Sequence, residues 1–157
     1  MKKITPFLWF DTQAEEAAKF YTSIFKNSKI TSVHHMGEDS PGPSKNVVMV
    51  TFQLEGQSFM ALNGGPMYKF SPAISLYVDC QTQSEIDFLW DKLSEGGELQ
   101  QCGWLTDRFG ITWQIVPSVL GELMSSSDRA AARRVTEAML KMIKLDIAEL
   151  QKAAKQG

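Results

Sequence analysis

The sequence predicts an α+β fold made of two β-α-β-β-β modules followed by C-terminal helices. The first observation is a repeat, because Leu8–Gln13 (LWFDTQ) returns as Leu76–Gln81 (LYVDCQ) at an offset of 68 residues (76 − 8 = 68). A repeat at a fixed offset indicates a duplicated structural unit. The second observation is that each copy continues with the same order of strand-like and helix-like patterns. Chance similarity between two amphipathic stretches is the alternative explanation.

The first copy begins with an apolar, aromatic-rich stretch that is typical of a strand. Apolar residues three and four positions apart then predict an amphipathic helix. The expected elements are a strand, a turn, a helix, a strand and a hairpin, over residues 4–10, 11–13, 14–25, 29–36, and 47–54 with 57–63. The polar, breaker-rich segment Gly37–Ser44 is either a flap over a pocket or a plain hairpin connection.

The second copy follows a break at Asn63–Pro66 (NGGP) and repeats the order of the first. Its expected elements are a strand, a helix and three short strands, over residues 73–80, 84–93, 98–102, 104–106 and 112–116. Gly96 and Gly97 stop the helix, and Pro117 ends the duplicated part.

The remainder of the chain has helical patterns. A short helix is expected over Leu120–Met124, with Ser125–Ser127 as capping candidates for one long helix that starts near Asp128. Its methionine-rich apolar face, which continues to Leu150, is typical of a core or a dimer seam. We therefore expect a first module over 1–64, a second over 72–117 and a helical extension over 118–157, within one structural domain.

Composition excludes several function classes. The 157 residues are 43% hydrophobic and 22% charged, with a net charge of −2 and no block of like charges, so no nucleic-acid partner is expected. No apolar run approaches the roughly 20 residues of a membrane helix, and no signal peptide is evident, so a cytoplasmic protein is expected. The two cysteines, Cys80 and Cys102, are expected to be reduced thiols.

Three segments carry a resemblance to a known family. Asp107–Val116 (DRFGITWQIV) resembles an Asp-x-Phe-Gly-x-x-Trp-Glu turn before a last strand. Gln13–Ala17 with Phe20 and Tyr21 resembles a first helix, and Arg133–Asp146 resembles a C-terminal helix. Together with the duplicated pattern they resemble the vicinal oxygen chelate superfamily, which includes glyoxalase I, extradiol dioxygenases and bleomycin-resistance proteins. The resemblance is to its PhnB-like branch, often labelled 3-demethylubiquinone-9 3-methyltransferase.

The resemblance implies a cup-shaped, incomplete barrel formed by the strands of both modules, with a divalent metal inside the cup in many relatives. The corresponding positions in this chain are Thr5, Ala73, Gln114 and, near the end of the first module, Ala61 with Asn63 on the same face. Alanine cannot ligate a metal, and one neutral amide does not hold Zn²⁺, Ni²⁺ or Fe²⁺. We therefore expect no cofactor and no metal.

Aromatic and polar side chains are expected inside the cup. Strand residues alternate between faces, so Phe7 and Trp9 share a face in one copy, as do Ser75 and Tyr77 in the other. The expected ligand-binding residues are Phe7, Trp9, Asn63, Ser75, Tyr77 and Gln114. Such a set is typical of a small-molecule pocket, although aromatic residues that fill a barrel core are the alternative.

The two histidines, His34 and His35, are candidates for acid/base chemistry. As neighbours on one strand they point to opposite faces, so only one can enter the cup. A surface or packing role is the alternative, and the sequence identifies no catalytic residue.

The sequence therefore favours a metal-free, homodimeric binding protein for a small, partly apolar or aromatic molecule. A metal-dependent lyase, isomerase or dioxygenase that uses Gln114 with His34 or His35 is an alternative. A methyltransferase that acts on a quinone-like substrate is another, although no Gly-x-Gly loop follows a strand that precedes a helix. A fourth is an interaction module that acts through its C-terminal helix. Whether the chain is an enzyme stays open.

Overall fold

The computed structural model describes residues 2–35 and 48–156. The chain divides into two compact units, residues 1–70 and 71–157. The expected loop Gly37–Ser44, with its role as a flap, lies outside the described residues.

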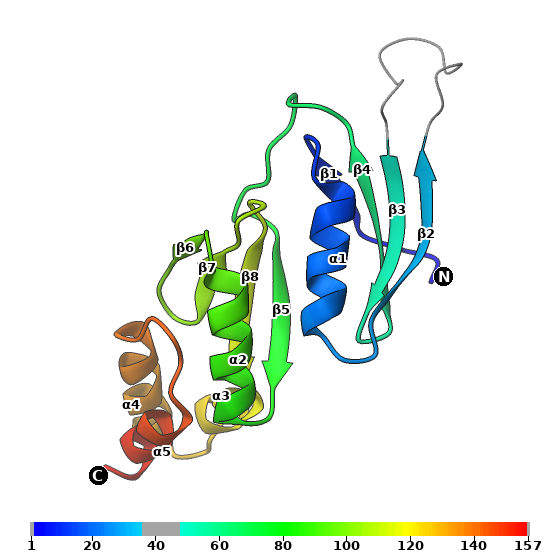
Figure 1. The fold of residues 1–157 in the computed structure, drawn as a ribbon. Coiled ribbons are helices and arrows are strands. Elements are labelled where there is room, and N and C mark those ends of the chain that lie inside the picture. Colours follow the sequence, from blue (N-terminus) through cyan, green and yellow to red (C-terminus); the bar gives the residue numbers. More distant parts are fainter. Residues whose placement is uncertain (1, 36–47, 157) are drawn as a thin grey trace. The chain divides into compact units, whose positions relative to one another are not determined.

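The first unit is a four-stranded sheet with one helix on one face (Figure 1). Its elements are β1 (Phe7–Phe10), α1 (Ala14–Ile24), β2 (Lys29–His35), β3 (Val48–Leu54) and β4 (Gln57–Asn63). The strand order is β1-β4-β3-β2, in which β1 runs parallel to β4 and the other pairs are antiparallel. The first β-α-β-β-β prediction is confirmed.

Small residues and aromatic rings join α1 to this sheet. The buried face of the helix has three alanines and Tyr21, and the alanines let the helix backbone approach the strands. The Tyr21 ring lies 6.4 Å from the Phe52 ring on β3, which stacks at 5.4 Å on Phe59 of β4. These contacts place the core of the unit between α1 and the inner residues of β3 and β4.

The second unit contains the same arrangement. Its elements are β5 (Ser75–Cys80), α2 (Gln83–Ser94), β6 (Glu98–Leu99), β7 (Trp104–Thr106) and β8 (Thr112–Pro117). The strand order β5-β8-β7-β6 matches that of the first sheet, again with one parallel pair, β5 with β8. The prediction of two equivalent α+β modules is confirmed, while their joining into one cup stays a prediction.

A buried carboxylate fixes the turn between β7 and β8. Asp107 is only 3% exposed, and its Oδ1 accepts hydrogen bonds from the backbone N–H groups of Phe109 (2.9 Å) and Ile111 (3.0 Å). Its Oδ2 accepts one from the indole N–H of Trp113 (2.8 Å). One local hydrogen-bond network around the Asp107 carboxylate therefore accounts for the spacing of Asp107, Phe109 and Trp113 in the sequence.

Three helices follow β8, and here the sequence prediction of one long helix is wrong. They are α3 (Ser118–Met124), α4 (Arg129–Leu140) and α5 (Ile147–Lys155). The chain leaves the helical path because the carbonyl of Met142 accepts a hydrogen bond from Cys102 N–H and that of Ile143 accepts one from Gly103 N–H, both at 2.8 Å. Aspartates, and not the expected serines, cap α4 and α5: Asp128 accepts from Ala131 N–H and Asp146 from Glu149 N–H.

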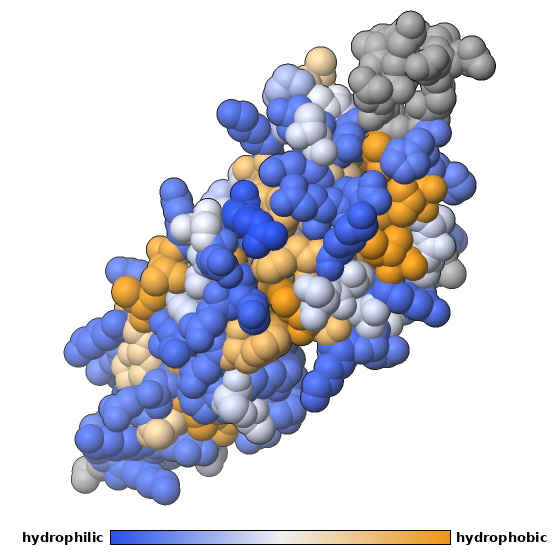
Figure 2. Space-filling view, viewed as in Figure 1, coloured by the Kyte–Doolittle hydropathy of each residue, from blue (hydrophilic) through white to orange (hydrophobic). Residues whose placement is uncertain are grey.

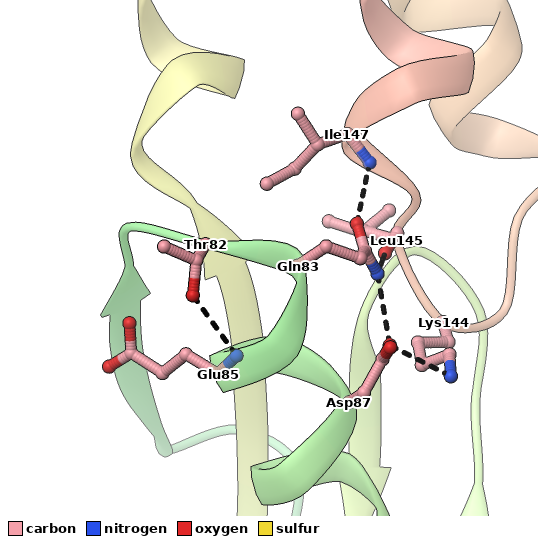
Figure 3. Close-up of polar contacts among 7 residues, drawn as sticks. All are labelled: Thr82, Gln83, Glu85, Asp87, Lys144, Leu145 and Ile147. Carbon is pink, nitrogen blue, oxygen red and sulfur yellow. Dashed lines mark hydrogen bonds and ion pairs between the residues drawn. The ribbon is translucent and has the colours of Figure 1, made fainter.

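These helices pack against the end of the second sheet. Their core consists of one residue of β8 and four residues of the extension, namely Val116, Leu120, Val135, Leu145 and Leu150. Gln83 at the start of α2 fastens the segment before α5: its Oε1 accepts from Ile147 N–H (2.8 Å) and its Nε2 donates to the Leu145 carbonyl (3.1 Å) (Figure 3). The extension is therefore an integral part of the second unit.

The face of the molecule in Figure 2 is mostly hydrophilic, with a hydrophobic patch over β2 and β3. Within the part of the chain that the structure describes, no helix combines the length and the apolar character that crossing a membrane requires.

Candidate ligand-binding face

Each sheet has one face covered by its helix and one face turned away from it, which we call the open face. In the second sheet, strand pairing places Tyr77 of β5 and Trp104 of β7 on either side of Gln114 of β8. The next row along the strands contains Ser75, Thr112 and Thr106. The inner residues Trp113 and Ile115 point instead to the helix, and both are buried. The three residues predicted for this module, Ser75, Tyr77 and Gln114, thus share the open face.

A hydrogen-bonded amide lies at the centre of this face. Gln114 Nε2 donates to Ser75 Oγ at 2.9 Å, and no described residue donates to Gln114 Oε1. Gln114, Ser75 and Trp104 are half-buried, and Tyr77 is 59% exposed. The arrangement offers one free acceptor and one hydroxyl between two aromatic side chains.

Two hydroxyl groups near this amide differ in their surroundings. The Thr112 side chain is buried, and its Oγ1 has no hydrogen-bond partner among the residues that the structure describes. Tyr77 lies at the accessible side of the row, and partial burial, followed by the negative charge of Asp79, raises its pKa. The phenol is therefore a neutral hydrogen-bonding group at physiological pH.

The C-terminal helices close one end of the open face. Val116, two residues after Gln114 on the same face, is 5% exposed and belongs to the core of the extension. Beside it, Ser118 Oγ donates to Asp79 Oδ1 at 2.7 Å. A molecule bound at Gln114 therefore cannot extend along β8 past Val116.

The open face of the first sheet is more apolar. Its row equivalent to Tyr77–Gln114–Trp104 consists of Trp9, Leu62, Met49 and His34. Phe7, which is 48% exposed, lies in the neighbouring row with Met60. Phe7 and Trp9 thus share a face as expected, and His34 lies on it while His35 points to the opposite side.

The Trp9 indole is fixed by the turn after β4. Its Nε1 donates to the Gly65 carbonyl at 3.0 Å, and the Tyr68 ring meets it edge-on at 5.1 Å. A Cβ on Gly64 would lie 2.3 Å from the indole, so only glycine fits there. The Asn-Gly-Gly-Pro segment therefore forms the turn against which the Trp9 indole packs.

Asn63 lies on the helix-covered face, apart from the other candidates. Its Oδ1 accepts a hydrogen bond from the Ala14 N–H at 2.7 Å, which satisfies a free donor at the start of α1. The strand register also corrects the expected counterpart of Gln114 in the first module. Leu62 lies opposite Trp9 as Gln114 lies opposite Tyr77, so Leu62 is that counterpart. Ala61, the expected residue, is buried beneath the helix.

At the positions where the resemblance implies metal ligands in relatives, this chain has residues that do not fit a divalent metal. Thr5 precedes β1 and its Oγ1 donates to the Lys2 carbonyl, Ala73 precedes β5, and Leu62 is the counterpart of Gln114 in β4. Across residues 2–35 and 48–156, no three His, Cys, Asp or Glu side chains are placed to hold a metal ion. Gln114 offers only a neutral amide oxygen to a metal ion.

Trp104 is a residue of the candidate face that sequence reasoning missed. It belongs to a strand of three residues, which is too short to show an alternating pattern. The only signal was an aromatic residue before the Asp-x-Phe-Gly turn, and assigning it a face requires the pairing of Trp104 with Gln114.

Comparison with known proteins agrees with this architecture. The family model of 3-demethylubiquinone-9 3-methyltransferase matches residues 2–116, so Arg133–Asp146 lies outside the match. A PhnB protein from Bacillus cereus, described under the same methyltransferase name, is 39% identical, with a TM-score of 0.68 over 74% of this chain and 100% of that chain.

Two more distant structures share the fold. Protein PA1353 from Pseudomonas aeruginosa is 23% identical, with a TM-score of 0.58 over 74% of this chain and 98% of its own. The fosfomycin resistance protein FosX from Listeria monocytogenes, complexed with Mn(II) and sulfate, is 13% identical, with a TM-score of 0.53 over 72% of this chain and 90% of its own. No curated protein matches the chain. The extent of the family match and the Bacillus cereus relative together establish that the chain belongs to the PhnB-like 3-demethylubiquinone-9 3-methyltransferase family.

Proposed function

We propose that this protein binds a small, partly apolar or aromatic molecule without a metal, on the open face of its second module. The observation that carries the proposal is the Gln114–Ser75 pair, at 2.9 Å, between Tyr77 and Trp104. Accessible aromatic surface around a few convergent polar groups is the usual composition of a small-molecule site. The resemblance implies that this amide takes the position of a metal ligand in relatives.

A binding experiment tests the role of the two aromatic residues. We expect a screen of small aromatic fragments, followed by NMR of the ¹⁵N-labelled full-length chain, to find molecules that shift the Gln114 side-chain amide signals. Tyr77→Ala and Trp104→Ala should each weaken that binding. Phe88→Ala is the matched control, because Phe88 is an aromatic residue of α2 that is 48% exposed. If Phe88→Ala weakens binding as much as the other two variants, the proposed face is wrong.

Metal analysis tests the other half of the proposal. After growth with added Mn²⁺ and Zn²⁺, we expect far less than one equivalent of metal in the purified protein at pH 7. A stoichiometric metal would favour the alternative, a metal-dependent lyase, isomerase or dioxygenase that uses Gln114 and His34. FosX, which shares the fold, is a complex with Mn(II). In that case Gln114→Ala and His34→Ala should abolish metal uptake.

Methyl transfer is a second alternative, which the family name suggests. It requires a site for S-adenosylmethionine, and in typical methyltransferases a glycine-rich loop joins the first strand of a parallel sheet to a helix. In this chain Asp11–Gln13 follows β1 and Asp79–Gln81 spans the end of β5 instead, and the neighbouring strands are mostly antiparallel. We expect calorimetry with S-adenosylmethionine to give no heat of binding, and a saturable signal would reverse this ranking.

The homodimer also stays a prediction. Light scattering during size-exclusion chromatography measures it directly, and a mass near 17.6 kDa would indicate a monomer.

A further inference from the structure

We propose, on the basis of the function proposed above, that the ligand of this face is an uncharged aromatic molecule with one hydrogen-bonding head that both donates and accepts, such as a carboxamide. Three features of the second sheet lead to this ligand class: its charges, its paired amide and hydroxyl, and the spacing of its aromatic residues.

The charges on the open face disfavour an anionic ligand. The nine described residues that strand pairing places there are Ser75, Tyr77, Asp79, Glu98, Trp104, Thr106, Thr112, Gln114 and Val116. None of these nine is a lysine, an arginine or a histidine, whereas two are carboxylates. Asp79 and Glu98 are exposed and lie at two margins of the face, away from Gln114. An anion would thus find no positive charge on this face, and a cation would find no carboxylate at its centre.

The Gln114–Ser75 pair matches a head that donates and accepts. With Gln114 Nε2 donating to Ser75 Oγ, the Gln114 carbonyl oxygen can accept and the Ser75 hydroxyl can donate. If the amide were turned by 180°, Ser75 would donate to Gln114, and the pair would still offer one donor and one acceptor. A carboxamide satisfies both groups, whereas a carboxylate brings only acceptors and an amidinium only donors.

The two aromatic side chains are spaced for one ring. Tyr77 and Trp104 lie on the strands that flank β8, so their backbones are separated by two interstrand spacings, about 10 Å. A ring above Gln114 would lie about 5 Å from each side chain, within the separation of favourable aromatic pairs. The closed end at Val116 leaves no room for a longer molecule in that direction.

Three isosteric probes test the ligand class: benzamide is neutral, benzoate is an anion and benzamidine is a cation. In NMR titrations of the full-length chain, we expect benzamide to shift the Gln114 amide and Trp104 indole signals, and benzoate to bind at least about tenfold more weakly. Gln114→Leu should weaken benzamide about two- to tenfold, as the loss of a neutral hydrogen bond does.

A substitution that adds a positive charge at position 114 gives the most decisive test. Gln114→Lys should reverse the order, so that benzoate binds more tightly than benzamide. Gln151→Lys makes the same substitution at an exposed position on α5 and should leave the order unchanged. If benzoate or benzamidine binds the unmodified face more tightly than benzamide, the ligand class is wrong while small-molecule binding stands. If none of the three shifts Gln114 or Trp104, this inference fails and the proposed binding face loses its support.

Discussion

The attachment of the C-terminal extension by Gln83 leads to a quantitative prediction. The Gln83 side chain makes three hydrogen bonds, to Ile147 N–H, to the Leu145 carbonyl and to Asp87 Oδ1 (3.0 Å) (Figure 3). Gln83→Met preserves the unbranched shape and the helix propensity but removes all three. The loss of the hydrogen bond to each of the two partly buried backbone groups then lowers the free energy of unfolding by about 1 kcal/mol. The bond to Asp87 adds little, because that carboxylate is solvated.

We therefore expect Gln83→Met to lower the free energy of unfolding by about 2 kcal/mol, which corresponds to a fall of about 4–8 °C in Tm for a chain of this size. Urea unfolding followed by circular dichroism measures this change. Hydrogen exchange provides the local readout, because the Ile147 amide should exchange at least about tenfold faster. The matched control is Lys144→Met, which removes only the exposed 2.9 Å ion pair with Asp87 and should change stability by less than about 0.5 kcal/mol.

The pH dependence of this contact has a definite sign. The hydrogen bond from Gln83, and then that from Lys144, lowers the pKa of Asp87. A lowered carboxyl pKa stabilises the fold above the ordinary pKa, and this contribution disappears as the pH falls below it. The difference between wild type and Gln83→Met should thus narrow slightly in acid. Equal stabilities of Gln83→Met and Lys144→Met, or unchanged exchange at Ile147, would show that Gln83 does not fasten the extension.

Two further substitutions and one labelling experiment test other contacts. Asp107→Asn should lower the free energy of unfolding by about 2 kcal/mol, because the oxygen that accepts from the buried Trp113 indole becomes an NH₂ group. Urea unfolding should show a smaller loss when the same substitution is made in a Trp113→Phe background. If the effects of the two substitutions simply add, the contact is contradicted. Gly103→Ala should destabilise by about 1–3 kcal/mol, because φ is +82° and the new Cβ would lie 2.8 Å from the Ile115 carbonyl oxygen; thermal melting measures this. Burial, followed by the charges of Glu85 and Asp79, raises the pKa of the Cys80 thiol from 9.0 to about 12. At pH 8 a thiol reagent should therefore label at most Cys102 until the chain unfolds. The free energy of unfolding should also fall progressively as the pH rises above about 9. Fast labelling of both thiols in the native protein would contradict this.

The sequence was sufficient for the architecture because the relevant signals are local. Apolar periodicity, the Asp-x-Gln motifs and the offset of 68 residues predict each module, and the structure confirms both modules. The long C-terminal helix was predicted wrongly for the opposite reason. Its apolar period is unbroken, but hydrogen bonds from Cys102 and Gly103, some forty residues earlier, draw residues 142–143 out of the helix. Asp146, which caps α5, was the one local sign of that break.

The candidate site was predictable where alternation along one strand determines the face and, for Gln114, where the Asp107–Val116 motif identifies the last strand. Phe7 with Trp9, and Ser75 with Tyr77, could be paired in this way. Asn63 could not, because its place depends on the register of β4 and on the hydrogen bond to Ala14 N–H.

The two modules have diverged in the part of the fold where the chemistry would lie. Both keep an aromatic residue on the first strand of the open face, Trp9 and Tyr77. In the first module the neighbouring strand contributes Leu62, and the indole N–H of Trp9 is already bonded to the Gly65 carbonyl. In the second module the neighbour is Gln114, whose carbonyl oxygen has no donor among the described residues. Duplication has thus built the scaffold twice while leaving an available hydrogen-bonding centre in the second copy, and this asymmetry is why we assign the ligand to the second module.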